Sequence, residues 1–212
     1  MLIDPARSTV VAWYDTLPDA LAGLIARVQA MAAEFLGAAF VPRDPAQVHA
    51  TLIGLERAAA PFDLEPLAAH LRAVLARPLT IQFGGFPPSD RRLLSRGLPL
   101  HHRGFSIRDG RVVLMGWPVD DDVPRPVLAD VRQGCAAFGV THRYGPDPDV
   151  YLVVGDVTSG ENADRPEAAV RSDLARAAVR VPLAARDLCL VTYYDDPALP
   201  RASTSWTPLL RR

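Results

Sequence analysis

The strongest constraint on the fold is a repeated order of predicted elements, which runs strand, helix, apolar strand, helix and strand in each half of the chain. The spacing from Trp13 to His49 nearly equals that from Trp117 to Tyr151, and a helix begins at the same distance after His49 and after Tyr151. Matched spacings of this kind indicate a duplicated unit. Periodicity places strands at 8–15, 48–55, 79–86, 111–119, 150–157, 179–183, 187–194 and 203–209, and helices at 18–36, 63–76, 124–138 and 165–178.

These elements predict an α+β fold with two pseudo-symmetric lobes, each an antiparallel-rich sheet with helices packed outside. We expect a single bilobal domain over 1–212, with lobe one at roughly 1–85, lobe two at roughly 110–212 and a loop insertion at 87–109. Two such units that share one core turn their equivalent strands toward a central cleft. The strands that contain His49 and Tyr151 are expected to lie opposite each other there.

His49 and Thr51 give the first apolar strand a chemical character. In a β-strand these two side chains share one face, while Val48, Ala50 and Leu52 share the other. An imidazole takes or gives a proton near neutral pH, and a hydroxyl donates a hydrogen bond to a phosphate oxygen. The pair therefore suits phosphate chemistry. The alternative is a half-buried strand histidine with no catalytic role.

Composition narrows the class of protein. The chain of 212 residues is 49% hydrophobic, enough for a sizeable core, and its net charge of −1 argues against a generic nucleic-acid-binding surface. All 23 basic residues are arginine, a bias that is global and marks no site. Cys135 and Cys189 form neither a disulfide framework nor a metal-ligand pattern, so both are expected to be buried in a reducing compartment. The start of the chain has no leader pattern, and we expect a cytoplasmic monomer without a membrane span.

Three segments of the chain are similar to a known family. The sequence resembles the 2H phosphoesterase superfamily, which includes 2′–5′ RNA ligase-like proteins and 2′,3′-cyclic phosphodiesterases, over nearly its whole length. The first His-x-Thr/Ser motif is matched by His49 to Leu52, the central segment by Phe83 to Pro87 followed by Val112 to Gly116, and the last core strand by Leu188 to Val191. The resemblance implies that two histidines act as general base and general acid and that two hydroxyls hold the phosphate of an RNA end or a (cyclic) nucleotide, without a metal or cofactor.

The second motif departs from the family pattern. Tyr151 stands where the family has histidine, and Val153 stands where it has threonine or serine. Valine cannot bond to phosphate, whereas a phenol is largely protonated at pH 7 and so is a proton donor but a poor base. Losing one positioned acid or base typically lowers a rate by about 10²–10⁴-fold.

Three functional interpretations follow. In the first, an atypical phosphoesterase, His49 is the general base, Tyr151 is a proton donor or phosphate ligand, and a loop arginine replaces the missing hydroxyl. In the second, His142, His101 or His102 enters the cleft and restores the pair. In the third, the chain has lost its chemistry and binds a nucleotide, an RNA end or a protein in the same cleft.

The turn-rich connection at 139–149 supplies candidate substrate-binding residues. His142, Arg143 and Tyr144 lie in this connection, shortly before the strand that contains Tyr151. Loops that join rigid elements often carry the binding residues of a fold. We therefore predict contacts between these three side chains and the substrate.

Overall fold

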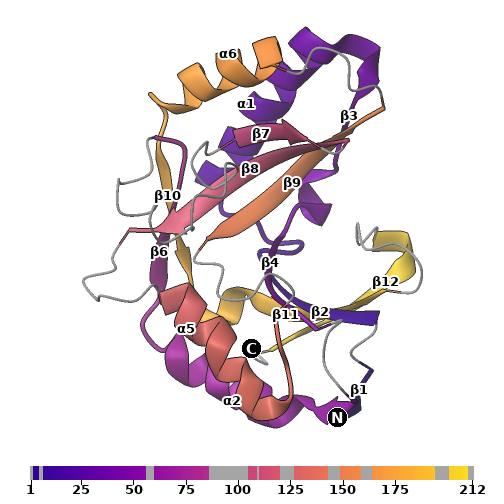
Figure 1. Ribbon diagram of the computed structural model, residues 1–212, viewed down its shortest axis with the longest axis vertical. Helices are drawn as coiled ribbons and strands as arrows, with labels where there is room; N and C mark the ends of the chain where they lie inside the picture. The colour runs from indigo at the N-terminus through magenta and orange to yellow at the C-terminus, as the bar shows by residue number, and fades with distance from the viewer. Residues whose placement is uncertain are drawn as a thin grey trace.

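The computed structural model describes residues 2–4, 7–55, 60–85, 105–108, 110–119, 127–142, 149–158, 164–193 and 201–209. They form an α+β fold around one large antiparallel sheet, which confirms the predicted fold class (Figure 1). The strands of this sheet are β2 (Ser8–Ala12), β3 (Phe40–Pro42), β4 (Ala50–Gly54), β6 (Leu79–Phe83), β7 (Phe105–Arg108), β8 (Arg111–Pro118), β9 (Val150–Val157), β10 (Val179–Leu183), β11 (Leu188–Tyr193) and β12 (Thr204–Pro208). A separate pair consists of β1 (Leu2–Ile3) and β5 (Phe62–Asp63).

The described helices agree with the periodicity. They are α1 (Asp19–Leu36), α2 (Leu64–Val74), α5 (Val127–Gly134) and α6 (Asp164–Leu174), and α5 continues as the 3-10 turn η4 (Cys135–Phe138). Asp63 caps α2, as its position before the helix predicts, by accepting a hydrogen bond from the backbone N–H of Glu65. Helix α1 packs against α6, β3, β9 and β10, whereas α2 packs against η4 at the opposite end of the molecule (Figure 1).

The sheet does not divide where the sequence suggested. Its order is β10-β6-β8-β9-β4-β2-β11-β12, so each half contains strands from both repeats. The first repeat contributes β2 and β4 to one half and β6 to the other, and the second repeat contributes β8 and β9 to one half and β11 to the other. The structure therefore does not follow lobe boundaries at 1–85 and 110–212. Spacing along the chain reveals repeats, but it carries no information about which strands pair across them.

A β-bulge occurs at the same place in both repeats. The register shifts between Val10 and Val11 where β2 pairs with β4, and between Val112 and Val113 where β8 pairs with β9. Val11 precedes His49 by the same distance as Val113 precedes Tyr151, which agrees with a duplicated unit. The bulges align Trp13 with Met115, not with Trp117 as the spacing suggested.

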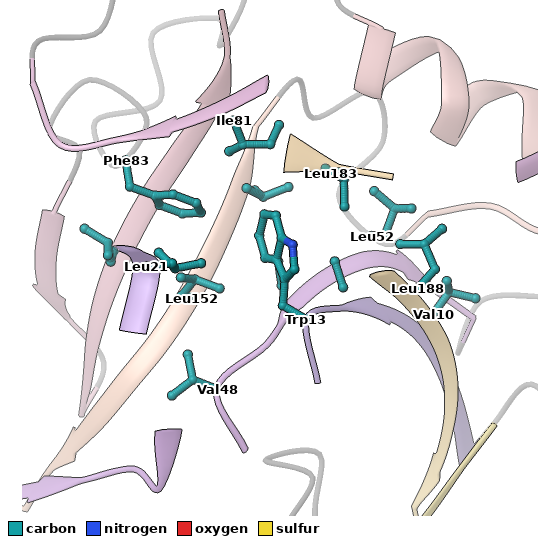
Figure 2. Close-up of a cluster of buried hydrophobic side chains, with 14 of the residues drawn as sticks. Val10, Trp13, Leu21, Val48, Leu52, Ile81, Phe83, Leu152, Leu183 and Leu188 are labelled. Atoms are coloured by element: carbon teal, nitrogen blue, oxygen red, sulfur yellow. The ribbon is translucent and has the colours of Figure 1, made fainter. Parts of the chain in front are cut away.

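One continuous core joins the two halves of the sheet. Figure 2 shows the indole of Trp13 among buried side chains from both halves, including Phe83 and Leu188. The rings of Trp13 and Phe83 are 5.9 Å apart at their centroids and nearly perpendicular, and Trp13 Nε1 donates a hydrogen bond to the carbonyl oxygen of Pro182. Both halves therefore enclose the same main core, and a second, smaller cluster of buried side chains, Val11, Tyr14, Cys189 and Val191, lies in the half that contains β2 and β11.

Helix α1 is the most apolar helix of the described chain. By length and composition the segment Asp19–Ala39 could cross a membrane, a weak sign that core helices also give. Its buried residues Leu21, Leu24, Ile25 and Val28 form one face that belongs to the core. These contacts place one face of α1 in the core, and the cytoplasmic location stays a prediction.

Two other sequence predictions can be compared with the structure. Cys135 and Cys189 are buried free thiols, as predicted, and burial raises the pKa of each to about 12. The predicted loop insertion at 87–109 contains a strand that the sequence analysis missed, because β7 forms a hairpin with β8. The remainder of this insertion, which includes His101 and His102, lies outside the described residues.

We predict that Gly155→Ala destabilises the fold by about 1–3 kcal/mol through overpacking. A Cβ atom at this position in β9 would overlap Cε2 of Phe40 and lie 3.0 Å from the carbonyl oxygen of Val41, so β3 would have to move. Gly23→Ala is the matched control, because Gly23 lies on α1 with no atom within 4 Å of the added Cβ. Helix propensity alone should make this control about 0.5–1 kcal/mol more stable. Urea unfolding measures both, and equal shifts would contradict the close packing of β3 on β9.

Candidate functional site

The centre of the sheet is a narrow junction between the two repeats. Strands β4 and β9 share a single register pair, Ala50 with Leu152, and both side chains are fully buried (Figure 1). Because neighbouring residues of a strand face opposite sides, the residues before and after this pair project from the other face of the sheet. The junction therefore fixes which side chains of the two repeats share that face.

Those side chains are the ones that the two motifs predict. His49 and Thr51 flank the pair on β4, and Tyr151 and Val153 flank it on β9. All four are half-buried, in contrast to the buried residues between them. The structure thus brings the two motifs together on neighbouring strands of one sheet, and their roles toward a substrate stay predictions. We call this group of four residues the motif cluster.

The imidazole of His49 is held in one tautomer. Its Nδ1 lies 2.7 Å from the carbonyl oxygen of Gln47, which can only accept, so Nδ1 carries the hydrogen and donates it. Burial lowers the pKa of His49 to about 4, the hydrogen bond to Gln47 opposes this shift, and the charge of Arg43 adds to it. At pH 7 the ring is neutral, and its Nε2 has a lone pair to accept a proton.

Tyr14 and Trp206 form an aromatic row with His49. The rings of Tyr14 and His49 are 5.9 Å apart at their centroids, and those of Tyr14 and Trp206 are 6.5 Å apart, both edge to face. Tyr14 is buried and its hydroxyl lies 2.9 Å from Oγ1 of Thr204, whereas Trp206 is 41% exposed. This aromatic row places an apolar surface beside a proton acceptor.

Two residues with left-handed backbone hold Tyr14 in this row. Trp13 and Asp15, on either side of it, have φ values of 62° and 66°. Residues other than glycine adopt such angles at a cost of roughly 1–2 kcal/mol each. The conformation sends the Trp13 side chain into the core while Tyr14 lies beside His49, so backbone strain is concentrated at the candidate site.

A guanidinium group also lies close to the motif cluster. Arg43 Nε and Nη2 donate to the two carboxylate oxygens of Asp156, at 2.9 and 3.0 Å. The backbone N–H of Arg43 donates to the carbonyl oxygen of Val154, the residue after Val153, at 3.1 Å. Arg43 is therefore fixed both to the strand of the second motif and within electrostatic range of His49.

Beyond the shared pair the two strands separate, and helix side chains take up the freed backbone groups. Arg132 of α5 donates to the carbonyl oxygens of Leu52 and Thr51 on β4 and of Asp149 before β9. At the other end of the junction, Gln29 of α1 donates to the carbonyl oxygens of Val154 and Arg43. Because buried carbonyl groups need partners, these two side chains fix the strands that carry the motif cluster.

The predicted substrate-binding residues have mixed outcomes. His142 is 4% exposed, and its Nδ1 accepts a hydrogen bond from the backbone N–H of Gly54 at 3.1 Å. Burial, and to a lesser extent the charge of Arg132, lowers the pKa of His142 to about 3. These contacts give His142 a structural role at the end of β4, and its role toward a substrate stays a prediction. Arg143 and Tyr144 lie outside the described residues.

Sequence reasoning missed three residues of the site. Tyr14 was assigned to a strand, Arg43 to a connecting loop and Trp206 to an edge strand, each without a functional role. Only the bracketing prolines around Arg43 signalled a rigid loop, and no local pattern predicts the backbone reversal at Tyr14. Within the described part of the chain, no three His, Cys, Asp or Glu side chains are grouped as metal ligands.

Comparisons with known proteins add little to this geometry. Neither the scan against protein-family models nor the search of curated proteins gives a match. Among solved structures, the chain is similar to the crystal structure of TT0787 of Thermus thermophilus, with 16% sequence identity and a TM-score of 0.47 over 95% of this chain and 93% of that chain. A similarity of this size says nothing about activity.

Acid should destabilise the protein from about pH 6.5 downward. The reference pKa of histidine is 6.5, whereas His49 and His142 have values of about 4 and about 3 in the folded chain. The unfolded chain therefore binds protons first, and stability falls by about 1.4 kcal/mol per pH unit for each ring until the pH passes its folded-state pKa. Urea unfolding at several pH values measures this slope.

The variant His142→Gln removes the contribution of one histidine to the pH dependence of stability. Glutamine keeps an acceptor for the N–H of Gly54, so the hydrogen bond to the backbone is retained. Its stability should depend on pH with about half the slope of the wild type between about pH 6 and pH 4. An unchanged slope would show that His142 is not a neutral buried ring.

Proposed function

We propose that this chain is a 2H phosphoesterase-like protein that acts on a phosphodiester of RNA or of a cyclic nucleotide. The observation that carries the proposal is the fixed tautomer of His49, whose Nδ1–H is bonded to Gln47 and whose Nε2 is left as a proton acceptor. The hydroxyl of Thr51, on the same face, would donate a hydrogen bond to a phosphate oxygen. Substrate and activity are inferred from this chemistry and from the resemblance of the first motif.

The proposed reaction is hydrolysis of a 2′,3′-cyclic phosphate by one general base. His49 Nε2 accepts a proton from a water molecule as the water oxygen forms a bond to phosphorus. The bond from phosphorus to one ribose oxygen breaks, and that oxygen receives a proton from the Tyr151 hydroxyl or from solvent. This hydrolysis step uses no metal ion. A proton then returns from His49 to Tyr151 through solvent, which restores the protonation states of both residues.

The low pKa of His49 bears on how the base operates. A ring with a pKa of about 4 is almost entirely unprotonated at pH 7 but is a weak base. A phosphodiester bound beside it carries a negative charge, which favours the imidazolium form and raises the pKa in the complex. The substrate itself would therefore strengthen the base that acts on it.

A binding protein is the second candidate, and the aromatic row favours it. Trp206 is 41% exposed next to Tyr14, and bases of nucleotides stack on such rings. With Val153 in place of a hydroxyl and Tyr151 in place of a histidine, the same site would retain recognition of a nucleotide, an RNA end or a protein without turnover.

His49→Ala is expected to lower hydrolysis of 2′,3′-cyclic AMP by about 10²–10⁴-fold, because it removes the general base. Tyr151→Phe removes only the hydroxyl and should have a smaller effect, since solvent can protonate the leaving oxygen. Product formation measured by chromatography tests both variants. His70→Ala, on helix α2, is the matched control for the loss of a histidine.

The two candidate functions give different results in this experiment. Binding of the nucleotide without turnover by the wild type, together with loss of binding in His49→Ala, would support the binding protein. Turnover that survives unchanged in His49→Ala would contradict both candidates.

A further inference from the structure

The second motif lacks a phosphate-binding hydroxyl, and an arginine is anchored to the same strand. Val153 occupies the position of the hydroxyl on β9 and cannot donate a hydrogen bond. Arg43 is anchored beside it, because its backbone N–H donates to the carbonyl oxygen of Val154 and its own carbonyl oxygen accepts from Gln29 Nε2 at 2.7 Å. The start of this side chain is therefore fixed on both sides.

Only one edge of the Arg43 guanidinium group is bound by a carboxylate. Nε and Nη2 bind Asp156, whereas Nη1 has no hydrogen-bond partner among the residues that the structure describes. The Arg43 side chain is 11% exposed and the Asp156 side chain is 44% exposed, so the ion pair lies at the border of the sheet and solvent. A carboxylate that holds one edge of a guanidinium leaves the remaining N–H groups in a defined direction for an anion.

Local charge favours an anion as the partner. Asp156 pairs with Arg43, and Arg111 is its register partner across β8 and β9, so two arginines and one carboxylate lie in this part of the sheet. The Arg43 charge also reaches His49, where it contributes to keeping the ring neutral. An anion between Arg43 and His49 would meet a positive group on one side and a neutral proton acceptor on the other.

We propose that Arg43 binds the phosphate group in place of the missing hydroxyl at position 153, with Asp156 as a positioning residue. Nη1 of Arg43 and Oγ1 of Thr51 would then donate to two different non-bridging oxygens of one phosphodiester. The inference rests on the proposed function of the motif cluster, and it specifies a phosphate contact for that function. The arginine also neutralises charge that builds up on these oxygens as water attacks.

Arg43→Gln tests the assignment. It should weaken binding of inorganic phosphate and raise KM for 2′,3′-cyclic AMP by about 10- to 100-fold, the range expected for a lost charge-assisted hydrogen bond. Phosphate binding is followed by isothermal titration calorimetry and turnover by steady-state kinetics. Asp156→Asn also breaks the ion pair but keeps the guanidinium, and because Asp156 only positions that group, its loss of phosphate affinity should be clearly smaller than that of Arg43→Gln.

A rescue separates phosphate binding from a purely structural ion pair. Adding Val153→Thr to Arg43→Gln puts a hydroxyl back at the second motif and should recover a measurable part of the lost affinity. Equal losses in Arg43→Gln and Asp156→Asn, with no recovery by Val153→Thr, would overturn the inference. If Arg43→Gln does not fold, Arg43→Lys keeps the charge and serves in the same comparison.

The experiment also distinguishes this inference from the proposed function. Turnover that depends on His49 but is unaffected by Arg43→Gln overturns only the role of Arg43. Phosphate binding that depends on Arg43 without any turnover supports the role of Arg43 and the binding-protein candidate.

Discussion

The contact between Ala50 and Leu152 is the constraint on which the rest of the structure depends. It is the only register pair that β4 and β9 share within the described chain, and the two strands diverge on both sides of it. Divergence leaves backbone carbonyl groups in the interior, and each must find a donor. Arg132 from the second repeat serves β4 and Gln29 from the first repeat serves β9, so each repeat completes the central strand of the other.

The same junction explains how a chemically mixed site arises in an apolar sheet. A short contact between two strands exposes one face on both sides of it, and the motif cluster occupies that face. The left-handed residues Trp13 and Asp15 then add Tyr14 to the edge of the cluster and bury an indole in the shared core. Strain, core packing and the candidate site are therefore coupled within three consecutive residues.

Much of this organisation could be predicted from the sequence, because it depends on local patterns. Alternation identified β9 and β10 with their observed limits, helical spacing identified α1, and the order of elements revealed the repeat. The alternation also predicted that His49 and Thr51 share a face.

What the sequence did not predict depends on long-range pairing. The exchange of β6 and β11 between the two halves involves strands far apart in the chain, and no local signal specifies it. His142 is buried at the end of β4, where it accepts a hydrogen bond from the backbone N–H of Gly54. No pattern in the sequence indicated that Arg43 belongs to the site, because its partners Asp156 and Val154 lie in the other repeat.

The exchange of strands has a consequence for synthesis of the protein on the ribosome. Strand β2 is made long before β11, yet β11 is one of its two neighbours, and Ser8 lies 3.3 Å from Thr192 at their hydroxyl oxygens. One edge of β2 therefore stays unpaired until β11 has been translated, and exposed strand edges of this kind invite association with other chains. This half of the sheet can close only after β11 leaves the ribosome, and a nascent chain would need chaperones up to that point.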